Sequence, residues 1–345
     1  MATKLTWVAL GVGALVVMAT VYAKQTVNMH SGAAITLLEE TLPTQNGVGV
    51  VFEGAVPAWA EDAIAVMAKL EQWRGKAFTQ NLQVTFQLQG DEGVAGWYNS
   101  QTKQLMVSTA GSERFGQGVM LHEIFHALQD QSFDLFALHS RTMPPDQEKA
   151  LTALIEGEAM LAVSELMDYD FEAHAQLPVE GPVSDELFEK LFIYAAGVRF
   201  VRTLREAGGW DAVDAAFADP PSATTLIFQP ERYLAGEREV AISDIPIAAG
   251  EQMQSTEVQG EYGVRLWLVR DPKTRPLVEL AGDAYEADVL AVLTNADGQA
   301  IQRWVIEFSD PEIAHDMGDA AVDLLPQKAD TFMVEVSGKT VTLEW

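Results

Sequence analysis

The sequence predicts an α+β protein that begins with a hydrophobic helix. Two long stretches, residues 115–130 and 146–170, carry apolar residues at helical spacing. Short apolar runs before and after them are typical of strands. An uncharged segment, residues 5–23, lies between Lys4 and Lys24. Together these observations predict an N-terminal transmembrane or signal helix, a mixed domain with a small β-sheet, and a small β-rich α+β module at the C-terminus.

The N-terminal segment has two interpretations. Its 19 uncharged residues can span a bilayer and exceed the core of about 7–15 residues found in signal peptides. Val21-Tyr22-Ala23 also fits a cleavage site for signal peptidase. In both cases Lys4 stays in the cytoplasm and the rest is exported. We expect residues 1–24 to be an anchor or a cleaved signal, residues 25–46 a stalk, and the remainder extracytoplasmic, whether membrane-anchored, secreted or periplasmic.

Composition limits the classes of partner and of site. The formal net charge is −28, which repels nucleic acid and anionic membrane surfaces and excludes nucleic acid as a partner. The chain has no cysteine, so disulfides and thiolate metal ligands are excluded. The exported part must therefore be stabilised by its hydrophobic core, and its length favours two domains.

Residues 47–238 are expected to form the first domain. A strand at 47–52 and a helix at 57–73 come first. Apolar residues alternate over 81–88, as in a half-buried strand. A second strand or a hairpin at 97–108 then leads into the long helix.

The most informative motif is His122-Glu123-Ile124-Phe125-His126. On a helix, residues i and i+4 share a face, so both imidazoles can bind one metal ion. Zinc lowers the pKa of a bound water to about 7, and the adjacent Glu123 could accept its proton. Asp130, one turn further on, could accept a hydrogen bond from a ligand imidazole and orient it.

The next helix offers a third ligand. Glu156-Gly157-Glu158 interrupts an apolar stretch, where a carboxylate is costly to bury unless it is paired or bound to metal. Gly157 suggests that another helix approaches closely. Glu156 is the preferred ligand and Glu158 the alternative. Two simpler interpretations stay open: buried histidines satisfied by hydrogen bonds without metal, and a solvated acidic helix face.

Two segments of this region resemble a known family. HEIFHALQDQSFDL (122–135), followed by ALIEGEA (153–159), is similar to gluzincin-type zinc metallopeptidases, in which HExxH and a downstream glutamate bind zinc. More narrowly, it resembles an uncharacterised bacterial metallopeptidase family with HELTHALQDQ and EGDA motifs. Further matches at 96–109, 193–201 and 208–221 extend the similarity over roughly residues 90–235.

The resemblance implies a zincin-like catalytic domain, in which a small sheet with an edge strand lies beside the active-site helices. It implies Zn²⁺ as cofactor, with His122, His126 and Glu156 as ligands and Glu123 as general base. Tyr194 becomes a candidate to stabilise the oxyanion of the tetrahedral intermediate. The edge strand would bind an extended peptide substrate through main-chain hydrogen bonds. The residues that match this substrate strand are Gln104, Leu105, Met106, Val107 and Ser108.

One segment departs from the family. Where the family reads STEQILHP, this chain reads ATTLIFQP (223–230), so that Thr225 replaces a glutamate and Gln229 a histidine. The Gln229 amide can donate hydrogen bonds but carries no charge. Losing one oxyanion donor typically costs about 10²–10³ in rate, so zinc binding is expected to persist while turnover is weakened.

Residues 239–345 are expected to form the C-terminal module. Strands are predicted at 288–293 and 301–308, and a helix at 311–325. A closing hairpin of residues 331–336 and 340–345 turns at Ser337-Gly338.

The expected function is hydrolysis of peptide bonds in a peptide or protein substrate by a zinc metallopeptidase. The alternative is a catalytically weak or inactive relative that serves as an extracytoplasmic binding or assembly module, and an amidase of small substrates is also open. The other histidines are expected to be ordinary surface or hydrogen-bonded side chains: His30, His139, His174 and His315.

Overall fold

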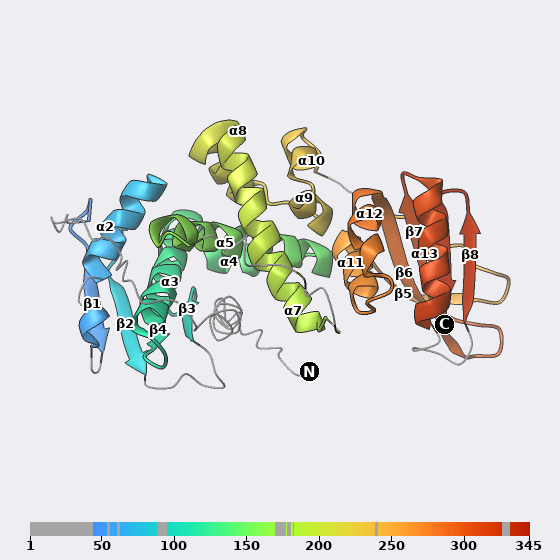
Figure 1. Ribbon diagram of the computed structural model, residues 1–345, viewed down its shortest axis with the longest axis horizontal. Coiled ribbons are helices and arrows are strands. Elements are labelled where there is room, and N and C mark those ends of the chain that lie inside the picture. Colours follow the sequence, from blue (N-terminus) through green and yellow to red (C-terminus); the bar gives the residue numbers. More distant parts are fainter. Residues whose placement is uncertain are drawn as a thin grey trace. The chain divides into compact units, whose positions relative to one another are not determined.

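The computed structural model describes residues 44–345 except 54–55, 61–62, 88–94, 170–176, 178–180, 182, 239–240 and 326–331 (Figure 1). The chain is α+β with two small sheets, as predicted. The predicted N-terminal helix, residues 25–43 of the predicted stalk, His30 and His174 lie outside the described residues. No helix in the described ranges combines the length and hydropathy needed to cross a membrane.

The chain forms two compact units. Unit 1 takes its described residues from Met1–Arg141, Ala153–Gln176 and Ile193–Asp219. Unit 2 takes them from Thr142–Thr152, Leu177–Phe192 and Pro220–Trp345. The predicted boundary between residues 238 and 239 stays a prediction. The compact units divide the chain differently because packing groups segments that are distant in sequence.

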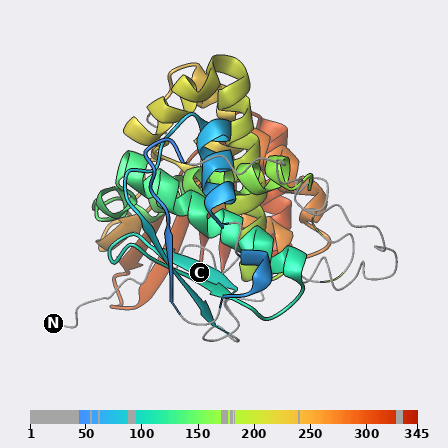
Figure 2. The same ribbon diagram turned by 90° about the vertical axis from the view of Figure 1, so that its left-hand side faces the viewer.

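Unit 1 contains a four-stranded sheet covered by helices. The strand order is β1-β2-β4-β3. Strands β1, β2 and β4 are parallel to one another, and β3 and β4 form an antiparallel hairpin. Figure 2 shows α3 running across the sheet, and apolar side chains of the sheet, α2 and α3 share one buried core. The elements are β1 (Val50–Glu53), η1 (Ala58–Ala60), α2 (Ala63–Arg74), β2 (Leu82–Gln87), β3 (Gly96–Asn99), β4 (Gln104–Ser108) and α3 (Glu113–Phe133).

The strand order corrects the predicted substrate strand. Gln104–Ser108, which is β4, pairs with β2 on one side and with β3 on the other, so it has no free edge. The edge strand next to it is β3, Gly96–Asn99. A signal for this was present, since Leu105, Met106 and Val107 are a continuous apolar run, which is typical of an interior strand.

Within unit 1, α5 (Pro145–Leu166) and α8 (Gly197–Ala218) pack closely through glycine. A Cβ on Gly157 would lie 2.2 Å from the Gly197 carbonyl carbon, and one on Gly197 would lie 2.2 Å from the Ala153 oxygen. The close approach predicted for Gly157 is therefore confirmed. The other helices in this stretch of the chain are α4 (Leu135–His139), α7 (Asp185–Lys190), the π-helical η3 (Leu191–Ala196), α9 (Thr224–Phe228) and α10 (Pro230–Leu234).

Unit 2 contains an antiparallel sheet with the order β5-β6-β7-β9-β8. The predicted strands at 288–293 and 301–308, the helix and the closing hairpin are confirmed. The sequence did not predict β5, α11 or α12, because β5 is mostly polar with every residue exposed and the two helices are brief. The elements are β5 (Gln252–Glu257), α11 (Gly260–Val269), η4 (Arg275–Leu277), α12 (Val278–Asp283), β6 (Tyr285–Thr294), β7 (Ala300–Phe308), α13 (Pro311–Leu324), β8 (Met333–Ser337) and β9 (Thr340–Glu344).

Candidate metal centre

Helix α3 carries the HExxH motif through the buried core of unit 1. Its first turn is capped by Ser112, whose hydroxyl accepts a hydrogen bond from the Phe115 backbone N–H. Every residue from Gly118 to Asp130 is buried, and His122 and His126 are completely so. The two rings lie one turn apart, with their Nε2 atoms 2.9 Å from each other.

Glu156, on α5, completes the group. Its Oε2 lies 3.1 Å from His122 Nε2 and 3.5 Å from His126 Nε2. A tetrahedral ion with ligands at roughly 2.0–2.1 Å would hold neighbouring ligand atoms about 3.3 Å apart. The three observed separations lie on both sides of that value. His122, His126 and Glu156 therefore form a buried group that could hold a metal ion.

The charges of His122, His126 and Glu156 shift one another's pKa values. Burial alone lowers the pKa of His126, but the Glu156 carboxylate outweighs it and raises that pKa to about 9. Burial and the neighbouring His126 lower the pKa of His122. Burial alone would raise the pKa of Glu156, yet the two histidines bring it well below its usual range. A metal ion would compete with the proton that this group otherwise holds.

Glu123 lies beside this group, and the backbone N–H of Tyr98 on β3 is close enough to lower its pKa without forming a full hydrogen bond. It is completely buried, and neither carboxylate oxygen has a hydrogen-bond partner among the described residues. Burial raises the pKa of the Glu123 carboxyl well above its usual value. A buried polar group without a partner is rare and calls for a functional explanation.

Strand β3 passes directly against Glu123. A Cβ on Gly96 would lie 3.1 Å from Glu123 Cγ and 2.4 Å from a Val119 methyl carbon. Only glycine lets the strand approach this closely. The free edge of the sheet and the unpartnered carboxylate thus lie together.

The structure corrects the predicted partner of the histidines. Asp130 accepts hydrogen bonds from Tyr98 Oη at 2.7 Å, Lys103 Nζ at 2.6 Å and the Leu135 backbone N–H at 3.1 Å, and does not contact the imidazoles. Gln129 contacts His126 instead, with Oε1 2.8 Å from Nδ1. The spacing of three residues from His126 to Gln129 was the available signal, because i and i+3 also share a helix face.

Two other predicted residues of unit 1 lie outside the ligand group. Glu158 points away from the metal ligands, forming an ion pair with Arg74 and accepting a hydrogen bond from Gln129 Nε2 at 2.8 Å. Tyr194 is buried in η3, three residues before the Gly197 that packs on α5. Single-turn π segments are frequent at functional sites.

His139 is the residue that sequence reasoning missed most clearly. It ends α4, and its Nε2 is buried without a hydrogen-bond partner among the described residues. Burial lowers its pKa, and the charges of Glu156 and His126 also act on it. The pattern around His139 is that of a surface loop, so only the folded chain brings it into the range of the metal ligands.

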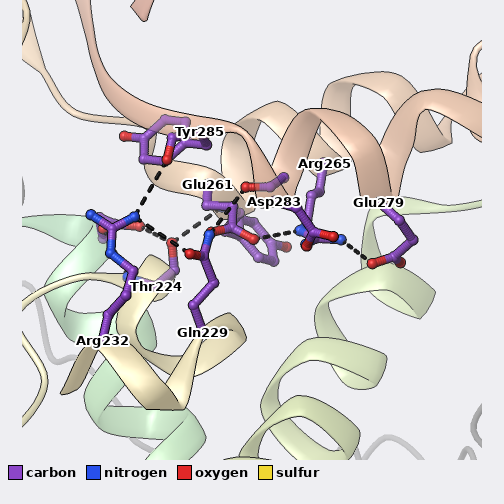
Figure 3. A network of polar contacts seen from close by, with 11 residues as sticks. Thr224, Gln229, Arg232, Glu261, Arg265, Glu279, Asp283 and Tyr285 are labelled. Carbon is purple, nitrogen blue, oxygen red and sulfur yellow. Dashed lines mark hydrogen bonds and ion pairs between the residues drawn. The ribbon is translucent and has the colours of Figure 1, made fainter. Parts of the chain in front are cut away.

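Thr225 and Gln229 lie in unit 2, and Gln229 belongs to a second polar cluster there. Thr225 is buried and its hydroxyl has no hydrogen-bond partner among the described residues. The Gln229 amide donates to Glu261 Oε2 at 2.8 Å (Figure 3). It also donates to the Gly282 carbonyl at 3.1 Å. Glu261 also forms an ion pair with Arg265 at 2.7 Å. The donor hydrogens of Gln229 are therefore engaged inside unit 2.

Comparison with protein-family models, curated proteins and solved structures found no match to this chain. The family resemblance carried by residues 122–135 and 153–159 therefore stays a prediction.

Proposed function

We propose that this protein is a zinc-dependent metallopeptidase of the gluzincin type. The observation that carries the proposal is the convergence of His122, His126 and Glu156 next to the unpartnered carboxylate of Glu123. Two imidazoles and one carboxylate are a donor set that suits zinc and leaves one position open. When bound, zinc supplies a Lewis acid that activates water and polarises a carbonyl.

Glu123 is proposed as the general base. Its buried side chain follows His122 on α3, and burial makes its carboxylate readily accept a proton. It would take the proton of the attacking water and deliver it to the leaving amine. Tyr194 is proposed to donate a hydrogen bond to the oxyanion, as the resemblance implies.

An extended peptide is the proposed substrate. Strand β3 has one strand partner, β4, in the described part of the chain, and its Gly96 lies against Glu123. A peptide paired with the free edge of β3 would bind through main-chain hydrogen bonds, which tolerate many side chains. This placement corresponds to a zincin-like domain with β3, in place of β4, as the substrate strand. We propose that hydrolysis takes place outside the cytoplasm, with residues 1–24 serving as anchor or signal.

Zinc analysis of the full chain, purified in detergent, tests the metal centre. We expect about one zinc per chain, lost in His126→Ala and retained in His315→Ala, whose histidine is exposed. An absence of zinc after loading at neutral pH would contradict the proposal.

A peptide-library digest tests the reaction, with Glu123→Gln as the matched blank. Cleavage by the wild type that is absent from the blank supports a peptidase. Zinc binding with identical digests for both proteins would favour the binding-module alternative.

A further inference from the structure

Gln129 connects a metal-ligand histidine to a buried ion pair. Its Oε1 lies 2.8 Å from His126 Nδ1, and its Nε2 donates to the Ile155 carbonyl at 2.9 Å and to Glu158 Oε2 at 2.8 Å. Glu158 in turn pairs with Arg74 Nε. Gln129, Glu158 and Arg74 are all buried, so each of these contacts is shielded from water.

The hydrogen-bond pattern defines which way the Gln129 amide points. The Ile155 carbonyl and the paired Glu158 carboxylate can only accept, so the NH₂ group of Gln129 must face them. Its oxygen then faces His126 Nδ1, which must carry the hydrogen. His126 Nε2 faces Glu156 and His122, and on metal binding it would release its proton and offer its lone pair to the ion.

Glu158 is held in place from the far side. Arg74 donates to Asp214 Oδ1 at 2.6 Å through its NH2 group, and its guanidinium carbon lies 4.4 Å from the centre of the Trp210 ring. Although Arg74 Nη1 has no hydrogen-bond partner among the described residues, these two further neighbours hold the guanidinium beside Glu158. By contrast, His122 Nδ1 has no hydrogen-bond partner among the described residues.

We propose that Gln129 is the positioning residue of the metal centre, and that Glu158, fixed by Arg74, orients Gln129. This inference rests on the proposed zinc site. Gln129 holds His126 as the Nδ1–H tautomer while its neutral amide separates the imidazole from the Glu158 charge. The affinity for zinc is thereby set at Gln129 through the orientation of one ligand.

Zinc affinity, measured by competition with a chelator on the full chain, tests this relay. We expect Gln129→Met to weaken zinc binding by about 10–100-fold, the usual effect of losing an outer-shell partner. Gln131→Met is the matched control, because Gln131 lies two residues on in α3 and binds the Thr79 and Gln80 backbone. The control should bind zinc within about twofold of the wild type.

A double exchange tests orientation separately from packing. Gln129→Glu with Glu158→Gln moves the carboxylate onto His126 and the amide beside Arg74, so the acceptor for Nδ1–H is restored. We expect its zinc affinity to return to the wild-type value or to exceed it, since a direct carboxylate raises ligand basicity.

The tautomer of His126 can be measured directly, and a purely structural role of Gln129 would not affect it. In ¹⁵N-resolved NMR of the zinc form, His126 should be the Nδ1–H tautomer in the wild type and in the double exchange. In Gln129→Met, the His126 Nδ1 proton should exchange with water faster than in the wild type.

The outcomes separate the two proposals. No zinc in the wild type overturns both the metallopeptidase and the relay. Zinc in the wild type, with unchanged affinity and an unchanged His126 signal in Gln129→Met, overturns the relay alone. If Gln129→Met does not fold, the double exchange still decides: affinity well below the wild type would contradict the relay.

Discussion

At the scale of single residues, the site is defined by polar atoms that lack partners. Glu123 has two such oxygens, His122 has Nδ1 and His139 has Nε2. Elsewhere in unit 1, Arg74 Nη1 and Ser164 Oγ also lack partners among the described residues, whereas the carboxylates of Asp130 and Glu158 are closely paired. Leaving a buried group unpaired costs about 1–3 kcal/mol, so a concentration of such groups around one cluster indicates selection for chemistry over stability.

Glu123→Gln is expected to remove hydrolysis while leaving zinc in place. The amide is nearly the same size but cannot accept the proton of the attacking water, and a general base contributes about 10²–10⁴ in rate. Peptide cleavage and zinc content measured on the same preparation check this. Cleavage at the wild-type rate would exclude Glu123 as the base.

His139→Phe is expected to leave the zinc stoichiometry unchanged. The ligand atoms of His122, His126 and Glu156 lie within 4.8 Å of one another, and His139 is not part of that group. Zinc content of the purified variant checks this. Loss of the metal would make His139 a fourth ligand.

At the scale of elements, helix packing positions the third ligand. α5 carries Glu156, and the next residue, Gly157, contacts the backbone of Gly197 at the start of α8. The two glycines let the backbones approach, and this contact sets the depth at which Glu156 lies. The sheet acts in the same way through Gly96, which brings β3 against Glu123.

Gly157→Ala is expected to lower the free energy of unfolding by about 1–3 kcal/mol, the usual cost of overpacking, despite the gain in helix propensity. The new methyl would lie 2.2 Å from backbone atoms that cannot rotate away. Urea unfolding measures the change. Gly49→Ala is the control, since nothing lies within 4 Å of that position and its change should stay near 0.5 kcal/mol. Equal effects of both substitutions would contradict the close packing of α5 against α8 at Gly157.

At the scale of the whole molecule, unit 2 contributes a buried acidic network with its own pH dependence. Burial outweighs the hydrogen bonds from Thr224 and raises the pKa of Asp146 to about 7. Burial likewise outweighs Arg265 and Gln229 and raises the pKa of Glu261 to about 7. Both carboxyls therefore hold protons in the folded chain that the unfolded chain has already released.

The free energy of unfolding of unit 2 is expected to fall as the pH rises from about 4 to 7. In this window the folded state binds more protons than the unfolded state, so the slope is negative, with a loss on the order of 3 kcal/mol per group. Urea unfolding at pH 5 and pH 8 measures it. Glu261→Gln should flatten the slope, whereas Glu279→Gln, an exposed member of the same network, should not. A wild type that is more stable at pH 8 than at pH 5, with the difference removed by Glu261→Gln, would contradict the raised pKa of Glu261.

The sequence by itself determined the features that depend on near neighbours along the chain. The i, i+4 spacing of His122 and His126 requires one helix face, and the apolar residues around Glu156 require that its carboxylate be buried. Gly157 indicated a close approach by its lack of a side chain. Local periodicity carries this information because a helix turn relates only residues three or four apart.

The tertiary structure alone decided which groups meet across elements. It placed β4 inside the sheet and β3 at its edge, selected Gln129 over Asp130 as the partner of His126, engaged Gln229 with Glu261, and brought His139 within range of the ligands. Strand order and side-chain partners depend on contacts between residues far apart in sequence, and the chain's local pattern is compatible with several such pairings. The ligands were thus readable from the motif, whereas the residues that orient them emerged only once the chain was folded.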